Sequence, residues 1–175
     1  MPPKASRIIF ILGGARSGKS TFALKKGQTR LPKAFVATGE PFDEEMKLRI
    51  RKHRQSRGKQ WTTHEVPLEL TDWFQEESHH FASVVVDCMT LWLNNLLRES
   101  SRSPKVISQV KKLLKAIRLC PCQTVIVSNE LGLGLVPGDA ASRKFRDLAG
   151  RLNQLVAAEA DEVYFLVSGL PLRVK

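Results

Sequence analysis

The sequence predicts an α/β fold with a mostly parallel sheet and helices on both of its faces. Short apolar runs rich in β-branched residues alternate with segments of helical periodicity along the chain. The apolar runs are continuous, which is typical of parallel strands buried on both faces. The 175 residues suffice for one domain with a core of ordinary size. We therefore expect a loose N-terminal arm at residues 1–6 and a single domain at 7–175.

From the N-terminus, two strand–helix units and a short strand are expected. The strand runs are apolar and β-branched: RIIFIL, AFVAT and WTTHEV. The first helix follows a glycine-rich loop and has Gly27 near its end, and the second has Asp43 as N-cap with two glutamates in its first turn. In order, the elements are a strand at 7–12, a helix at 20–31, a strand at 34–38, a helix at 43–57 and a strand at 61–66.

The second half of the chain repeats the alternation. SVVVDCM and TVIVSN have the pattern of buried strands, and DEVYFLVSG and PLRV end the chain as strands. The two longer helices between them each carry an apolar stripe at helical spacing. In order, the elements are a strand at 83–89, helices at 90–100 and 104–119, a strand at 124–129, a helix at 142–160 and strands at 161–169 and 171–174.

The chain is strongly basic, with 28 Lys+Arg, 17 Asp+Glu and a formal net charge of +11. Such an excess indicates an anionic partner, which is a nucleic acid, an acidic surface or a polyphosphate ligand. Aromatic residues make up only 7% of the chain and do not interleave with the basic ones, which argues against a nucleic-acid platform. No apolar run approaches the ~20 residues of a membrane span. The N-terminus lacks the pattern of a signal peptide, so the expected location is the cytoplasm.

The three cysteines are Cys88, Cys120 and Cys122. An odd number of cysteines in a chain without an export signal argues against a disulfide framework. No second cysteine pair or nearby histidine completes a zinc site around Cys120 and Cys122. We therefore expect free thiols without a chemical role.

The octet GGARSGKS carries the strongest functional signal in the chain. It matches G-x-x-x-x-G-K-[ST] between an expected strand and an expected helix. The glycines let backbone N–H groups face phosphate oxygens, and the helix N-terminus adds a positive potential. Lys19 is expected to reach the terminal phosphates and Ser20 to ligate Mg²⁺. The predicted nucleotide-binding residues of this loop are Gly13, Gly14, Ala15, Arg16, Ser17, Gly18, Lys19 and Ser20.

Two further residues are candidates for the same site. Asp87 ends the run SVVVD, where an acid that ligates Mg²⁺ or caps the next helix is expected. His53 lies in the cationic stretch LRIRKHRQSRG, whose basic residues favour the neutral imidazole. A neutral imidazole is a nucleophile that attacks phosphorus, and the arginines are suited to holding phosphates. From spacing alone, a surface histidine without a chemical role is the alternative.

The chain resembles the bifunctional adenosylcobinamide kinase/adenosylcobinamide-phosphate guanylyltransferase family of cobalamin biosynthesis. Four stretches carry the resemblance in the family's order: GGARSGKS, ATGEPFDEEMKLRIRKHRQSR, VVVDCMTLWLNNLL and the C-terminal stretch that begins VSNELGLGLVPGD. The resemblance implies a P-loop NTPase with a RecA-like, mostly parallel sheet and one late antiparallel strand, for which PLRV is the candidate. It also implies a homotrimer.

The resemblance further implies an activity and a set of site residues. The family transfers the γ-phosphate of ATP or GTP to adenosylcobinamide. It then transfers GMP from GTP to that phosphate through a GMP–histidine intermediate, giving adenosylcobinamide-GDP and pyrophosphate. The family's histidine falls on His53. Its other nucleotide contacts fall on Ala37, Thr38, Gly39, Arg54, Gln55, Ser56, Arg57, Glu65 and Asp87. The implied cofactor is Mg²⁺, with Ser20 and Asp87 as its ligands. The implied partners are adenosylcobinamide, its phosphate and the two nucleotides, with no nucleic acid and no membrane span.

Two other functions remain open on the residues themselves. One is a small-molecule P-loop kinase in which His53 has no chemical role, and it predicts no covalently bound GMP. The other is a basic NTPase that binds nucleic acid, and it predicts salt-dependent binding of RNA or DNA.

Overall fold

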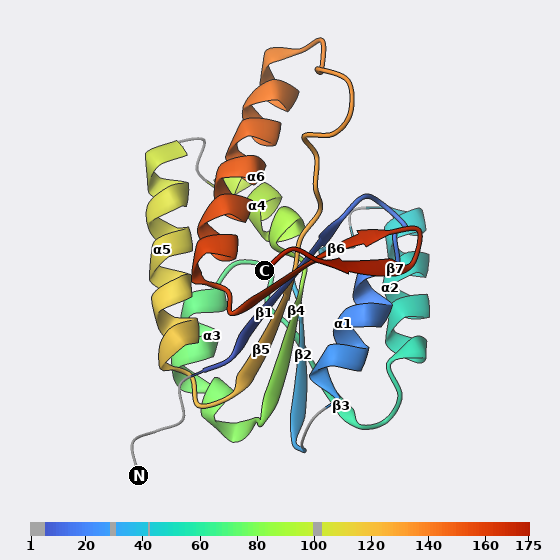
Figure 1. The fold of residues 1–175 in the computed structure, drawn as a ribbon, viewed down its shortest axis with the longest axis vertical. Helices are drawn as coiled ribbons and strands as arrows, with labels where there is room; N and C mark the ends of the chain where they lie inside the picture. The colour runs from blue at the N-terminus through green and yellow to red at the C-terminus, as the bar shows by residue number, and fades with distance from the viewer. Residues whose placement is uncertain (1–5, 29–30, 42, 100–102) are drawn as a thin grey trace.

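The structure, a computed structural model, describes residues 6–28, 31–41, 43–99 and 103–175. Within these ranges it leaves out the side chains of residues 46, 49, 52, 53, 56, 103 and 104. One seven-stranded sheet organises the chain, in the order β3-β2-β4-β5-β1-β6-β7 (Figure 1). Neighbouring strands are parallel except for β7, which runs antiparallel to β6. The mostly parallel sheet and its late antiparallel strand are thus confirmed.

The strands agree closely with the expected ones in position and are shorter at some of their ends. They are β1 Ile8–Gly13, β2 Lys33–Ala37, β3 Trp61–Glu65, β4 Ser83–Asp87, β5 Gln123–Val127, β6 Glu162–Val167 and β7 Leu170–Arg173. The helices are α1 Lys19–Gly27, α2 Glu44–Ser56, α3 Leu70–Glu76, α4 Met89–Glu99, α5 Ser103–Leu119 and α6 Ala140–Glu159, with a 3₁₀ turn η1 at Ser78–His80.

Two apolar cores lie on the two faces of the sheet. Along β1, Ile8 and Phe10 pack into the core shared with α3, α4, α5 and α6, whereas Ile9 and Ile11 pack into the core beneath α1. Successive strand residues point to opposite faces, so a strand covered on both faces is apolar throughout. Figure 1 shows α1 and α2 on one side of the sheet, with α3, α5 and α6 on the other.

Helix α1 ends at Gly27, four residues before the expected end. A Cβ atom at Gly27 would lie 2.7 Å from Cη2 of Trp61 and 2.9 Å from Cγ2 of Val85. The glycine therefore lets the end of the helix pack directly on the sheet.

Cys120 and Cys122 form a disulfide between the end of α5 and the start of β5, so the expectation of free thiols was wrong for this pair. Their Cα atoms are 5.4 Å apart, which lies within the usual range for a bridge. The intervening residue turns the chain enough for the two side chains to meet. Cys88 is a free, buried thiol as expected.

The parallel strands all end at one edge of the sheet, which we call the carboxyl edge. In open α/β sheets, ligands bind in the crevice at this edge. The residues that follow β1, β2, β3 and β4 include most of the predicted site. Among the described residues, no helix is both long and apolar enough to cross a membrane.

Candidate active site

The phosphate loop, residues 13–20, leads from the end of β1 into α1. Gly13 and Gly18 have φ values of 154° and 91°. A Cβ atom at Gly13 would lie 2.7 Å from the carbonyl oxygen of Leu166, and one at Gly18 would lie 3.3 Å from Cα of Gly169. Both glycines are therefore required by backbone conformation and by the close approach of the β6–β7 hairpin.

The β6–β7 turn also bonds directly to the phosphate loop. The N–H of Gly169 donates to the carbonyl oxygen of Ser17 at 3.0 Å. Sequence reasoning missed this contact, because nothing in the C-terminal strand pattern shows which loop its turn will touch. The hairpin thus supports the loop from the side opposite to β2 and β4.

Lys19 is 7% exposed and lies over the loop that it belongs to. Its ammonium group donates to the carbonyl oxygen of Gly14 and, at 3.4 Å, to Oγ of Ser17. Ser20 is half-buried in the first turn of α1. Contact of Lys19 with terminal phosphates and of Ser20 with a metal ion, which the motif predicts, stays a prediction.

The ends of β2, β3 and β4 meet at the carboxyl edge. In the strand register, Ala37 lies opposite Glu65 on one side and opposite Asp87 on the other. Ala37, Glu65 and Asp87, which are all predicted nucleotide contacts, are therefore neighbours across the sheet. Beyond Ala37, Gly39 approaches α4, since a Cβ atom there would lie 3.1 Å from Cδ1 of Leu91.

Thr38 is fully buried, unlike its predicted neighbours in this segment. Its hydroxyl donates to the carbonyl oxygen of Cys88 at 2.7 Å, and the N–H of Cys88 donates to the same hydroxyl at 2.9 Å. The side chain is therefore engaged with the backbone that follows Asp87. In this structure it supports the site from within the protein.

A cluster of opposite charges lies where helix α2 passes β3. Nη2 of Arg54 is 3.3 Å from Oε1 of Glu65. The guanidinium of Arg57 lies 3.5 Å above the ring of Phe35. It also donates to Oγ1 of Thr63 at 3.2 Å. These contacts place the end of α2 and the residue after it against the middle of β2 and β3 and against the last residue of β3.

The pKa of Arg57 reports on its surroundings. Burial has the largest effect and lowers this pKa. The positive charge of Arg54 also lowers it, whereas the carboxylates of Asp87 and Glu65 raise it. All three charged partners are predicted site residues. Their electrostatic effects reach one guanidinium, while their shared contact with a nucleotide stays a prediction.

His53 lies on α2 one residue before Arg54, in the turn that the two arginines hold against β3. The side chains of His53 and Ser56 lie outside the described residues. The side chain of Gln55 is exposed. The structure therefore places the backbone of the predicted nucleophile on the helix that borders the site.

Cys88 follows Asp87 and is chemically shielded. Burial, and after it the charge of Asp87, raise the pKa of its thiol, whereas Lys19 acts to lower it, and the pKa lies at about 12 as a result. A thiol with such a pKa stays protonated and is not a nucleophile at neutral pH. Lys19, at the start of α1, and Asp87, at the end of β4, therefore both act electrostatically on Cys88.

The oxygen donors at this edge suit a magnesium ion. The described residues contain no group of three or more His, Cys, Asp or Glu side chains that could hold a metal by themselves. Mg²⁺ is commonly bound by one or two protein oxygens together with substrate phosphates. The hydroxyl of Ser20 and the carboxylate of Asp87 supply such a set.

The loop at residues 128–139 starts at the same edge. Its residue Glu130 donates its N–H to the carbonyl oxygen of Gly13 at 3.1 Å, and Thr90 bonds to Oγ of Ser128 at 3.1 Å. Farther along, Leu135 is 97% exposed. The loop is thus anchored beside the phosphate loop and then leaves the body of the protein, as the orange segment at the top of Figure 1 shows.

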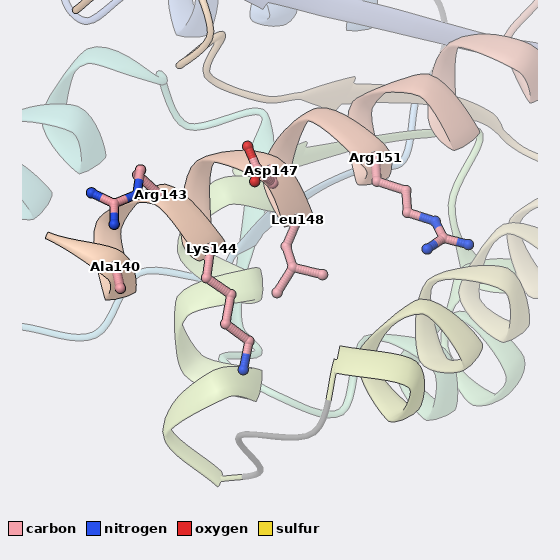
Figure 2. A pocket seen from close by; sticks show the side chains of 6 residues that line it. All are labelled: Ala140, Arg143, Lys144, Asp147, Leu148 and Arg151. Carbon is pink, nitrogen blue, oxygen red and sulfur yellow. The ribbon is translucent and has the colours of Figure 1, made fainter. Parts of the chain in front are cut away.

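An open depression of about 410 Å³ lies along the N-terminal half of α6 (Figure 2). It contains no residue of the phosphate loop, so this concave surface and the predicted nucleotide site are separate. Cationic side chains line it together with one acid and an apolar floor. The lining residues are Ala140, Arg143, Lys144, Asp147, Leu148 and Arg151.

The chain is similar to a family of nucleotide-dependent transferases. A family model described as "Cobinamide kinase / cobinamide phosphate guanyltransferase" matches residues 9–174. The bifunctional adenosylcobalamin biosynthesis protein CobP of Pseudomonas aeruginosa is 40% identical over 166 residues, covering 94% of this chain and 95% of that protein. The bifunctional adenosylcobalamin biosynthesis protein CobU of Escherichia coli is 34% identical over 180 residues, covering 96% of this chain and 99% of that protein.

Solved structures resemble the fold at much lower identity. An ATPase of a bacterial type III secretion system gives a TM-score of 0.53 at 15% identity, over 92% of this chain and 51% of that one. The RadB recombinase gives 0.51 at 16% identity, over 91% and 73%. These likenesses bear on the fold alone, and they confirm the RecA-like P-loop architecture.

Proposed function

The chain belongs to the cobinamide kinase/cobinamide phosphate guanyltransferase family, and from that premise we propose that both reactions take place at the carboxyl edge. In the first, adenosylcobinamide receives a phosphate from ATP or GTP. In the second, GMP from GTP is transferred to that phosphate. The observation that carries this proposal is the convergence of the phosphate loop, Asp87, Glu65 and helix α2 at one edge of the sheet.

In the kinase step, the substrate hydroxyl attacks the γ-phosphorus. The new O–P bond forms as the bond to the β-phosphate oxygen breaks, the hydroxyl proton is released, and ADP or GDP leaves. Backbone N–H groups of residues 13–18 and the ammonium of Lys19 would hold the transferred charge. A magnesium ion held by Ser20 and Asp87 would neutralise phosphate charge when bound.

In the guanylyl transfer, the imidazole of His53 is the proposed nucleophile. A ring nitrogen forms a bond to the α-phosphorus of GTP and pyrophosphate leaves, giving a GMP–histidine phosphoramidate. A phosphate oxygen of adenosylcobinamide phosphate then attacks the same phosphorus, and the N–P bond breaks. Arg54 lies in the last turn of α2 and Arg57 directly follows the helix. Both are suited to hold the phosphates, together with Gln55 and Ser56 as proposed contacts.

The remaining nucleotide contacts are proposed around this centre. Ala37 and Gly39 lie at and just beyond the end of β2, and we propose that Glu65 accepts hydrogen bonds from the nucleoside. We propose that the acceptor binds on the side of loop 128–139, because its base is bonded to Gly13.

The proposed intermediate is tested by incubating the protein with Mg²⁺ and GTP labelled at either the α- or the γ-phosphorus, without acceptor. We expect α-label that stays on the denatured protein, survives base and is lost in acid. The label should be absent from His53→Ala, whereas that variant should still phosphorylate adenosylcobinamide. Full GMP transfer by His53→Ala would rule out the covalent route. Absence of α-label together with kinase activity would favour the small-molecule kinase.

We propose a homotrimer in the cytoplasm, with no nucleic acid as partner. The trimer is supported by the resemblance and by exposed apolar side chains, which often mark contact surfaces. These gather on the loop after β5 and on the C-terminal hairpin, namely Leu133, Leu135, Val136, Val167, Leu170, Leu172 and Val174. Sedimentation equilibrium tests the assembly. A titration with single-stranded RNA at moderate salt tests whether a nucleic acid is a partner, and salt-sensitive binding would contradict the proposal that none is.

A further inference from the structure

Asn95, on the buried side of α4, bonds to two segments at the carboxyl edge. It is 3% exposed. Its Nδ2 donates to the carbonyl oxygen of Thr38 at 2.8 Å and to that of Pro67 at 2.9 Å. Thr38 directly follows β2, and Pro67 lies two residues after β3. One amide group thus joins the ends of two neighbouring strands.

Thr38 extends this connection to β4. Its N–H donates to the carbonyl oxygen of Asp87 at 3.2 Å, and its hydroxyl exchanges hydrogen bonds with the backbone of Cys88. The N–H of Val66 donates to the carbonyl oxygen of Ala37 at 2.8 Å. The ends of β2, β3 and β4 are therefore held as one unit, with Asn95 at its back.

The other half of the Asn95 amide has no use in folding. Its Oδ1 is buried and has no hydrogen-bond partner among the described residues. Burying an unpaired polar atom costs stability, and an aliphatic side chain of similar size would avoid that cost. The benefit of an asparagine here therefore lies in its two N–H donors, which bond to the segments that follow β2 and β3.

We propose that Asn95 is a positioning residue for the nucleotide and metal site. It acts through Thr38 and the backbone after β3, and it sets the place of the Asp87 carboxylate relative to the phosphate loop. This proposal rests on the proposed function, because its kinetic tests measure the two proposed reactions. Misplacement of a reacting group by about 1 Å can lower a rate about a hundredfold, so a small shift here has a measurable effect.

The central variant is Asn95→Leu, which removes both donors at nearly constant volume. We expect kcat/KM to fall about tenfold or more in both reactions and the Mg²⁺ concentration for half-maximal activity to rise several-fold. The matched control is Gln123→Leu, which removes an amide that donates to the carbonyl oxygen of Lys26 at 2.8 Å at the opposite edge of the sheet. Its kinetic constants should stay within about twofold of the parent.

A double-mutant cycle separates positioning from general destabilisation. Thr38→Val removes the hydroxyl that holds Cys88. If the two residues act through one connection, the losses caused by Asn95→Leu and Thr38→Val should be strongly non-additive. Asn95→Ser, which also lacks the amide donors, replaces the leucine variant should that variant fail to fold.

Two readouts do not depend on turnover. Hydrogen exchange should quicken at the amides of Thr38 and Cys88 in Asn95→Leu and not in Gln123→Leu. Binding of a fluorescent GTP analogue should lose its Mg²⁺ enhancement in the first variant alone. A parent protein that lacks guanylyl transfer would refute the proposed function, while these two readouts would still test Asn95.

The inference is overturned if Asn95→Leu keeps parental kinetics and Mg²⁺ dependence. It is equally overturned if both leucine variants lose activity only in proportion to their unfolded fraction, because Asn95 would then contribute to stability alone.

Discussion

Replacing Glu162 by glutamine should destabilise the protein strongly at neutral pH and hardly at all in acid. Glu162 is 4% exposed at the start of β6. The hydroxyl of Tyr164 donates to its Oε2 at 2.5 Å, Arg7 pairs with its Oε1, and Nζ of Lys26 lies 3.6 Å from Oε2. The carboxylate thus joins β1, β6 and the end of α1.

The size of the effect follows from the pKa of Glu162. The hydrogen bond from Tyr164 has the largest effect and lowers this pKa. Arg7 and Lys26 also lower it and burial raises it, so that the pKa falls from 4.5 to about 2. Because each pKa unit is worth about 1.4 kcal/mol, the ionised group contributes about 3 kcal/mol to the free energy of unfolding. A folded-state pKa below the unfolded value gives stability that is complete above pH 4.5 and is lost as the pH falls towards 2.

Urea unfolding of the parent and Glu162→Gln between pH 7 and pH 2.5 measures this difference. We expect a gap of about 3 kcal/mol at pH 7 that closes steadily below pH 4.5. Glu159→Gln is the control, because Glu159 pairs with Arg118 at 3.5 Å while half exposed, and such surface pairs contribute ~0–1 kcal/mol. A gap for Glu162→Gln that does not vary with pH would refute the electrostatic origin of the effect.

Gly13→Ala should abolish nucleotide binding without unfolding the protein, because the added Cβ atom would lie 2.7 Å from the carbonyl oxygen of Leu166. Isothermal titration with GTP measures the affinity, and an affinity equal to that of the parent protein would contradict this prediction. Gly27→Ala should lower the free energy of unfolding by about 1–3 kcal/mol through its clash with Trp61, with nucleotide affinity retained below the melting temperature. In the folded protein at pH 8, Cys88 should resist iodoacetamide, because burial and the charge of Asp87 raise the pKa of its thiol to about 12. The thiol should react once urea unfolds the chain, and mass spectrometry of the modified peptide measures both reactions.

Much of the fold could be predicted because buried parallel strands have a distinctive composition. The helix α3 was missed, although Leu70, Trp73 and Phe74 have helical spacing, since seven residues are too few for a clear period. The disulfide was missed because cysteine number is only an indirect sign of pairing. Backbone geometry decides whether two thiols can meet.

The phosphate-loop motif could be recognised from the sequence, whereas contacts between distant segments could not. Arg54, Glu65 and Asp87, which the resemblance implies as nucleotide contacts, all act on the pKa of Arg57. The hydroxyl of Thr38 bonds to the backbone of Cys88, and its place beside the nucleotide stays a prediction. Local sequence cannot show which hydrogen bonds a side chain will make with another strand.

The place of β1 between β5 and β6 has a consequence for folding of the protein. On both sides, β1 pairs with strands from the second half of the sequence, Gln123–Val127 and Glu162–Val167. Loop closure over such a separation is slow, and unpaired strand edges are prone to aggregation. The phosphate loop follows β1 directly, whereas the hairpin that bonds to Ser17 is far from it in sequence. The nucleotide motif therefore becomes a supported loop only after β6 and β7 have been synthesised and have paired with β1 and with each other.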